Sequence, residues 1–181
     1  MFNREHVFRF LLRRLGALDS RIARAAVLAL AGMGGGLLVW SGVIHLELRS
    51  DGYKDISVIG PHFLVQGIAS IVLAVAVVAL RWLALLAAGA VAGAATAVGL
   101  LLSVNVGLFG YTESLAVPYA RLSLAVEFTA AFVLVAGAGL LALASTAKAA
   151  SSQAHVPSPG NSSAPTSTFQ RAGPSRRIKL R

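Results

Sequence analysis

Residues 56–80 read ISVIGPHFLVQGIASIVLAVAVVAL, a run without one Asp, Glu, Lys or Arg. A helix needs about 20 apolar residues to cross a bilayer, and this run supplies them. Similar runs occupy residues 25–46, 83–109 and 122–146, and the only acid in them is Glu127. The backbone of a spanning segment must satisfy its hydrogen bonds internally. The four runs therefore predict an all-α fold, a four-helix transmembrane bundle.

The composition supports a membrane protein and excludes several kinds of site. Hydrophobic residues make up 56% of the 181 residues and charged residues 13%, whereas an average soluble domain has about 25% charged residues. The chain has no cysteine, which excludes disulfides, thiol nucleophiles, Cys-zinc sites and iron–sulfur clusters. No P-loop, dinucleotide-binding, zinc-protease or serine-hydrolase motif occurs in the sequence, so nothing in it points to an enzyme.

The charge distribution predicts how the protein is oriented. The chain carries 16 Lys and Arg against 7 Asp and Glu, a formal net charge of +9. Most of the positive charges lie before residue 25, at Arg81 between the second and third runs, and after residue 146. The positive-inside rule therefore predicts a multi-pass protein of the plasma (inner) membrane with both termini in the cytoplasm, in contact with anionic lipids. Near the basic C-terminal end only Phe169 is aromatic, so we do not expect nucleic acid as a partner.

The two ends of the chain differ from the membrane domain, residues 25–146. In residues 1–24, apolar and Arg side chains recur at helical spacing, which predicts a basic amphipathic helix on the membrane surface. This helix anchors the topology or, alternatively, binds a partner. Asp19 or Ser20 is expected to cap the first spanning helix. Residues 147–181 are rich in Pro and Ser and contain no apolar run, so we expect a disordered cytoplasmic tail.

Small residues recur at four-residue spacing within the spanning runs. Gly32 and Gly36 form such a pair in the first run, and Gly89 and Gly93 form another in the third. This spacing lets the backbones of two helices approach closely. We expect these glycines to pack inside the bundle or, alternatively, to form the seam of a homodimer.

The polar residues of the spanning runs gather near the predicted outer ends of the helices. They are His45 in the first run, His62 and Gln66 in the second, Asn105 in the third and Glu127 in the fourth. A carboxylate inside a membrane is costly, so we expect Glu127 to face protein partners, to be protonated, or both. The sequence therefore predicts a polar cluster at the outer end of the bundle.

Three interpretations of this cluster remain open. It fixes the helix register as a polar network, it forms a site for a small ligand or a proton, or His45 and His62 hold a haem or metal. Two histidines and one Glu without fixed spacing are weak evidence for a metal, so we assign no metal and no cofactor and keep haem as an alternative. The interpretation we favour is a non-enzymatic accessory or sensor subunit, working with a membrane partner or as a homodimer. The alternative is a small transporter or haem-containing redox protein that uses Glu127, His45 and His62.

Several short motifs are similar to those of a known group of proteins. They are residues 42–46 (GVIHL), Tyr53, residues 59–66 (IGPHFLVQ), residues 107–113 (GLFGYTE) and Glu127. Together they resemble uncharacterised small four-span integral membrane proteins of GC-rich bacteria. The resemblance covers the membrane domain and leaves out both cytoplasmic ends. It implies the four-span architecture and the outward-facing polar positions, and it implies no reaction.

Overall fold

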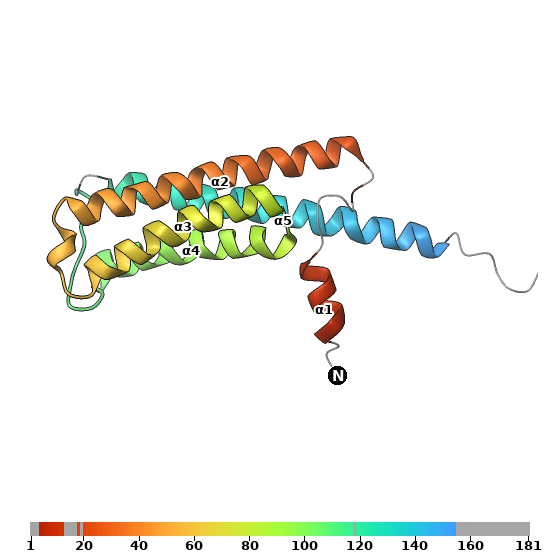
Figure 1. Ribbon diagram of the computed structural model, residues 1–181. Coiled ribbons are helices and arrows are strands. Elements are labelled where there is room, and N and C mark those ends of the chain that lie inside the picture. Colours follow the sequence, from red (N-terminus) through yellow and green to blue (C-terminus); the bar gives the residue numbers. More distant parts are fainter. Residues whose placement is uncertain (1–3, 13–17, 19, 118, 155–181) are drawn as a thin grey trace, which may run out of the picture.

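The computed structural model describes residues 4–12, 18, 20–117 and 119–154. Four long helices run side by side, and a short helix lies at one end of them (Figure 1). The elements are α1 (Arg4–Leu11), α2 (Arg21–Ser50), the 3-10 helix η2 (Tyr53–Asp55), α3 (Ile59–Leu80), α4 (Leu83–Asn105) and α5 (Ala120–Ala154).

Each of the four long helices is long and apolar enough to cross a membrane. The candidate spans are Arg21–Ser50, Ile59–Leu80, Leu83–Asn105 and Ala120–Lys148. The predicted all-α bundle of four transmembrane helices is therefore confirmed. Apolar side chains on the outside of α3, such as Val65 and Val72, are more than half exposed, as expected where lipid covers the surface.

The start of the first spanning helix follows the predicted cap. The backbone N–H of Ala23 donates to the Ser20 hydroxyl oxygen at 3.3 Å, and α2 begins at Arg21, four residues before the predicted boundary. An N-cap of this kind satisfies a helix N–H group that would otherwise lack a partner. α1 forms the first part of the predicted amphipathic segment, whereas residues 13–17 and Asp19 lie outside the described residues.

Several helix ends differ from the prediction: α2 ends at Ser50 rather than at residue 46, and α3 begins at Ile59 rather than at residue 56. α4 ends at Asn105 rather than at residue 109, because Gly107 adopts a left-handed φ of 77° that the helix cannot continue through. α5 continues to Ala154, into the segment predicted as a disordered tail. The last residues of α5 are Ala, Lys, Ser and Gln, none of which strongly opposes a helix. Residues 155–181, the rest of the predicted tail, lie outside the described residues.

Glycines bring two pairs of helices into close contact. A Cβ added at Gly42 on α2 would lie 2.8 Å from the carbonyl oxygen of Gly67 on α3. A Cβ added at Gly93 on α4 would lie 2.9 Å from the backbone oxygen of Glu127 on α5. Only glycine allows helix backbones to approach this closely. By contrast, α3 and α4 make fewer contacts with each other than either makes with its other neighbour.

The two predicted glycine pairs occupy different environments. Gly89 and Gly93 are buried against α5. Gly32 and Gly36 instead lie on the exposed face of α2, where an added Cβ would meet no atom within 4 Å. This corrects the expectation that both pairs pack inside the bundle. Four-residue spacing places two glycines on one helix face, but it does not determine which face turns inward.

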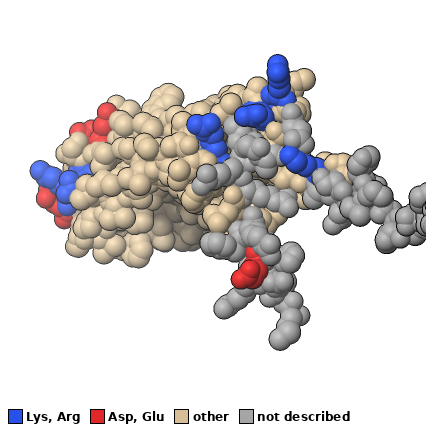
Figure 2. Space-filling model, turned by 45° about the vertical axis from the view of Figure 1, so that its right-hand side comes forward, with Lys and Arg blue, Asp and Glu red and all other residues tan. Residues whose placement is uncertain are grey.

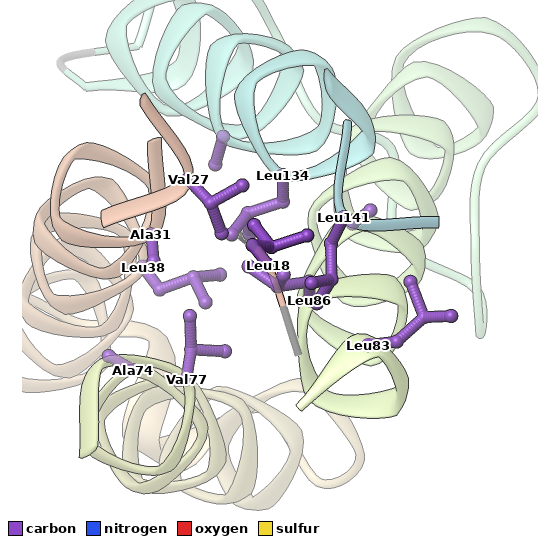
Figure 3. Packing of buried hydrophobic residues seen from close by; sticks show 12 residues of the cluster. Leu18, Val27, Ala31, Leu38, Ala74, Val77, Leu83, Leu86, Leu134 and Leu141 are labelled. Carbon is purple, nitrogen blue, oxygen red and sulfur yellow. The ribbon is translucent and has the colours of Figure 1, made fainter. Parts of the chain in front are cut away.

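The interior of the bundle changes character along its length. One end carries the α3–α4 turn, and we call it the turn end; the other carries η2 and the α4–α5 connection, and we call it the η2 end (Figure 1). Towards the turn end the core is apolar and includes Val27, Leu38, Val77, Leu86 and Leu134 (Figure 3). Towards the η2 end the buried side chains include Ser41, His45, Ser103, Ser123 and Glu127. The polar residues are thus concentrated at one end, as the sequence predicts.

The charged side chains also differ between the two ends (Figure 2). The described charges of α2 to α5 at the turn end are all positive, namely Arg21, Arg24, Arg81 and Lys148. The η2 end carries both signs: Glu47, Asp51, Asp55 and Glu113 against Arg49, Lys54 and Arg121. The positive charge of the chain is therefore concentrated away from the polar cluster.

We expect Gly93→Ala to lower the free energy of unfolding by about 1–3 kcal/mol, because the added methyl group would overlap the backbone of α5. Gly36→Ala is the matched control, because its Cβ has open space, and it should leave the free energy of unfolding unchanged or raise it by up to about 1 kcal/mol, since Ala favours a helix more than Gly does. The measurement is reversible unfolding in mixed detergent and SDS, followed by circular dichroism. Equal losses in the two variants would contradict the close approach of α4 to α5.

Candidate functional site

The centre of the polar cluster is Glu127, which projects from α5 into the bundle and is 1% exposed. Its Oε1 accepts a hydrogen bond from the hydroxyl of Ser123, one turn earlier on α5, at 2.9 Å. The same oxygen accepts a longer hydrogen bond, 3.5 Å, from the hydroxyl of Ser41 on α2. These contacts connect α2 and α5 through one carboxyl oxygen.

His45 on α2 is the third partner of that oxygen. Its Nδ1 lies 2.8 Å from the backbone oxygen of Ser41. A carbonyl oxygen can only accept, so Nδ1 carries a hydrogen and Nε2 is the other ring nitrogen available for a proton. Nε2 lies 3.7 Å from Oε1 of Glu127. An unprotonated Nε2 and a carboxylate would present two lone pairs to each other, so an attractive contact requires one proton on one of the two groups.

The second carboxyl oxygen of Glu127 has a different environment. Oε2 is buried and has no hydrogen-bond partner within the described part of the chain. The nearby Thr96 hydroxyl on α4 donates to the backbone of its own helix, where it lies 3.0 Å from the carbonyl oxygens of both Ala92 and Gly93. A buried oxygen without a donor carries a desolvation cost. Oε2 is therefore the position at which the cluster can accept a further hydrogen bond.

A second group of polar side chains lies in the connections at the η2 end. The Tyr53 hydroxyl donates to Oε2 of Glu113 at 2.7 Å, and the Tyr111 hydroxyl lies 3.4 Å from that of Tyr53. The other carboxyl oxygen, Oε1 of Glu113, accepts the backbone N–H of Ser114 at 2.8 Å. Both oxygens of this carboxyl group are therefore held in place by donors from the protein.

Aromatic rings connect the two polar groups. The ring centroids of Tyr53 and Tyr111 are 5.8 Å apart, and those of Tyr53 and Phe63 are 5.2 Å apart. Phe63 in turn meets the His45 ring edge-on at 5.3 Å. Such spacings are favourable for aromatic pairs. A continuous row of four rings thus runs from the loop of Tyr111 to the buried imidazole.

A cavity of about 250 Å³ opens between α3 and α4 beside this row. Its walls are mostly apolar, with polar groups from His45, His62, Gln66, Thr96, Ser103, Tyr111 and Glu113. A smaller space of about 40 Å³, bordered by Tyr53 and Ser123, lies on the other side of His45 and Phe63. The cavity exists because α3 and α4 lack the close glycine contacts that join the other neighbouring helices.

The structure brings only some of the predicted site residues together. His45 and Glu127 meet in the bundle interior. His62 is exposed and Gln66 is half-buried, and both line the cavity wall, where the Gln66 amide donates to the Ser70 hydroxyl at 3.4 Å. Asn105 is exposed and donates from its amide to the carbonyl oxygen of Leu101 on its own helix at 2.7 Å. Asn105 therefore does not join the cluster, in contrast to the expectation.

Sequence reasoning did not single out the loop residues of the site. Tyr53, Tyr111 and Glu113 lie in the motifs that carry the resemblance, but they fall in the connections between spanning helices, where no helical pattern marks them. Phe63 lies in α3 and was not singled out either. Glu113 and Tyr111 follow a tight turn in which Leu108 and Tyr111 exchange two backbone hydrogen bonds of 2.7 and 2.8 Å. The two Gly residues of GLFGYTE were the available signal, because glycines two to three residues apart are typical of such turns.

Comparisons with known proteins do not identify the chain. No protein-family model matches it, and neither the curated proteins nor the solved structures give a significant match. Conclusions about function therefore rest on the residues and the geometry described above.

We expect Glu127→Gln to keep the free energy of unfolding within about 1 kcal/mol of that of the native protein, because the amide can still accept from the serine hydroxyls and bond to His45. Glu127→Ala removes the acceptor and leaves His45, Ser41 and Ser123 without it, so a loss of about 1–3 kcal/mol is expected. Unfolding in mixed detergent and SDS measures both. A Gln variant as unstable as the Ala variant would show that the carboxyl proton, rather than hydrogen bonding alone, holds the cluster together.

Because of Tyr53, the free energy of unfolding should depend on pH in the alkaline range. Burial, then the hydrogen bonds to Tyr111 and Glu113, raise the pKa of Tyr53 above its ordinary value of 10.0. The stability that the neutral phenol contributes is therefore complete below pH 10 and is lost as the pH rises towards the folded pKa. Between pH 9 and 12 the free energy of unfolding should fall more steeply in the native protein than in Tyr53→Phe. Parallel curves for the two proteins would be evidence against the buried hydrogen-bonded phenol.

Proposed function

We propose that this protein is a non-enzymatic accessory or sensor subunit of the plasma membrane, and that its η2 end faces outward and receives a small ligand. Four helices able to span a membrane support the multi-pass assignment. A partner subunit, or a second copy of the chain, would then respond to the ligand.

The observation that carries this proposal is the cavity between α3 and α4. Its volume of about 250 Å³ lies just below the range of about 300–1,000 Å³ that is usual for pockets holding drug-sized ligands. Its apolar walls with a few converging polar groups have the composition of a ligand pocket. The cavity therefore suits a compact molecule with a small apolar body and one or two polar groups.

The distribution of charge supports the proposed orientation. The turn end carries Arg21, Arg24, Arg81 and Lys148 with no acid from the described residues of α2 to α5. The η2 end has more acids than bases. Positively charged segments are retained in the cytoplasm during insertion. A cytoplasmic turn end places the cavity at the outer surface, where an external molecule can reach it.

A second candidate function is proton or ion transfer by a small transporter. The contact that favours it is the pair of His45 and Glu127, which needs one proton for an attractive interaction. A group of this kind can take up and release a proton if water reaches it. Under this function Glu127→Gln would fold and insert normally but abolish transport, whereas a sensor would retain its ligand response.

Haem ligation by His45 and His62 would require a local rearrangement. The His45 Nδ1 donates to the Ser41 carbonyl, and Nε2 lies against Glu127. An iron ligand would have to be Nε2, turned away from the carboxyl group, because Nδ1 carries the hydrogen. A Soret band in protein purified after expression with added haem would establish this alternative.

The test of the proposed function uses the absence of native cysteine. Gly99 lines the cavity, and an added Cβ there would meet no atom within 4 Å. We expect Gly99→Cys to react, in intact cells, with membrane-impermeant charged methanethiosulfonate reagents, because the cavity opens outward. Gly139→Cys is the matched control: its Cβ also has open space, but it lies on the outer face of α5, away from the cavity, where charged reagents do not enter lipid.

Two results would contradict the proposal. A Gly99→Cys variant that reacts only in inverted vesicles would place the η2 end in the cytoplasm. A variant that reacts in neither preparation, although it reacts after unfolding in SDS, would show that no water-accessible cavity exists. Labelling is measured as the mass added to the purified protein.

A further inference from the structure

We propose that the cavity at the η2 end selects a small organic cation with a compact apolar body, such as a quaternary ammonium or a protonated amine. This inference rests on the proposed function, because it names the class of ligand for the same cavity. It comes from the charge of the cavity wall, the way in which that charge is held, and the rings around it.

The charge of the wall favours a cation. Glu113 is the acidic side chain in the lining, and no Lys or Arg contributes to the lining within the described part of the chain. The remaining polar groups of the wall are imidazole, amide and hydroxyl groups. An anionic ligand would therefore enter an apolar space with a carboxylate and no permanent positive charge, which is unfavourable.

The carboxylate is positioned rather than free to move. Tyr53 donates to one oxygen at 2.7 Å and the Ser114 N–H to the other at 2.8 Å. The backbone N–H of Glu113 donates to the carbonyl oxygen of Ser103 at 3.3 Å, which ties the loop to the end of α4. Each carboxylate oxygen has further lone pairs. The group can therefore attract a cation without losing the bonds that hold it.

Aromatic rings border the space beside this carboxylate. Phe63, Phe109 and Tyr111 line the cavity, and the Tyr53 ring packs against Phe63 in a tilted arrangement and against Tyr111 edge-on. The face of an aromatic ring attracts cations, and quaternary ammonium groups are recognised by several rings acting together. The rings and the carboxylate thus both favour a cation, and the apolar remainder of the wall accommodates the alkyl or aryl body of the ligand.

Phe109 is held at the entrance by a strained turn. Phe109 and Gly110 adopt φ angles of 53° and 79°, and the flanking Leu108 and Tyr111 close the turn with two hydrogen bonds. A positive φ is unusual for a bulky residue. The Phe109 side chain is nevertheless 70% exposed, so burial of its ring does not explain the strain. The turn places Phe109 in the cavity lining with its ring largely uncovered, so that a bound cation would contact the ring.

The first measurement compares the cationic reagent 2-(trimethylammonium)ethyl methanethiosulfonate with the anionic 2-sulfonatoethyl analogue at Gly99→Cys, at pH 8. Val106→Cys gives the reference ratio of rates, because Val106 is 76% exposed at the same end and does not line the cavity. We expect the preference for the cation at Gly99→Cys to exceed that reference at least tenfold. Adding Glu113→Gln should reduce it to the reference value. Adding Glu47→Gln, which removes an exposed acid of the same end outside the cavity lining, should leave it unchanged.

The second measurement uses a reversible ligand. Benzyltrimethylammonium should protect Gly99→Cys from labelling by the anionic reagent, and its neutral isostere 2,2-dimethylpropylbenzene should protect at least tenfold more weakly. Glu113→Gln should raise the half-protecting concentration of the cation at least tenfold, a difference of about 1.4 kcal/mol. Thermal unfolding of each variant shows whether the fold is retained.

The outcomes separate this inference from the proposed function. If Gly99→Cys is labelled from outside but both reagents react at the reference ratio and the cation gives no protection, the cation preference is overturned and the open outer cavity stands. If preference and protection persist in Glu113→Gln but not in Glu47→Gln, the assignment of Glu113 is overturned. If Gly99→Cys is unlabelled from outside, the proposed function fails, and this inference fails with it.

Discussion

A carboxyl group buried between membrane-spanning helices must find its hydrogen-bond donors within the protein, because lipid supplies none. Glu127 meets this constraint at one of its two carboxyl oxygens, Oε1, with Ser123 from its own helix and with Ser41 and His45 from α2. These contacts require one rotation and one register of α5 against α2. Because α3 packs on α2 and α4 packs on α5, the arrangement of the whole η2 end depends on this carboxyl group.

The cavity follows from the way the helices are paired. Glycine contacts hold α2 against α3 at Gly42 and Gly67, and α4 against α5 at Gly93. The polar contacts of Glu127 then join the two pairs along the α2–α5 side. Among the described residues, α3 and α4 make fewer contacts with each other than either makes with its other neighbour, and the cavity lies between them at the η2 end. Closer packing on the other three sides of the bundle therefore leaves space on the fourth.

Hydropathy was sufficient to predict the fold but not the rotation of each helix. The four apolar runs gave the spanning helices, and of the residues placed in the predicted polar cluster His45 and Glu127 do meet. Asn105 lies near the same end, yet its amide donates to its own helix. The position of a residue along a helix sets its depth in the membrane, whereas the packing of the helix sets the direction in which its side chain points. On α4 the pair Gly89 and Gly93 marks the face that turns inward, whereas Asn105 is exposed. Tyr53 and Glu113 were missed because a turn in the connection after α4, rather than a helical pattern, brings them together.

A ligand changes the state of a membrane bundle only if it binds one arrangement of the helices more tightly than another. The cavity is suited to such a difference, because it lies between the two neighbouring helices that make the fewest contacts. A bound molecule would touch Phe63 on α3 and Thr96 on α4 together, and would favour the arrangement in which both reach it. Phe63 also packs on His45, which in turn contacts Glu127. Occupation of the cavity is thereby linked, through side chains in direct contact, to the interaction that sets the register of α2 and α5.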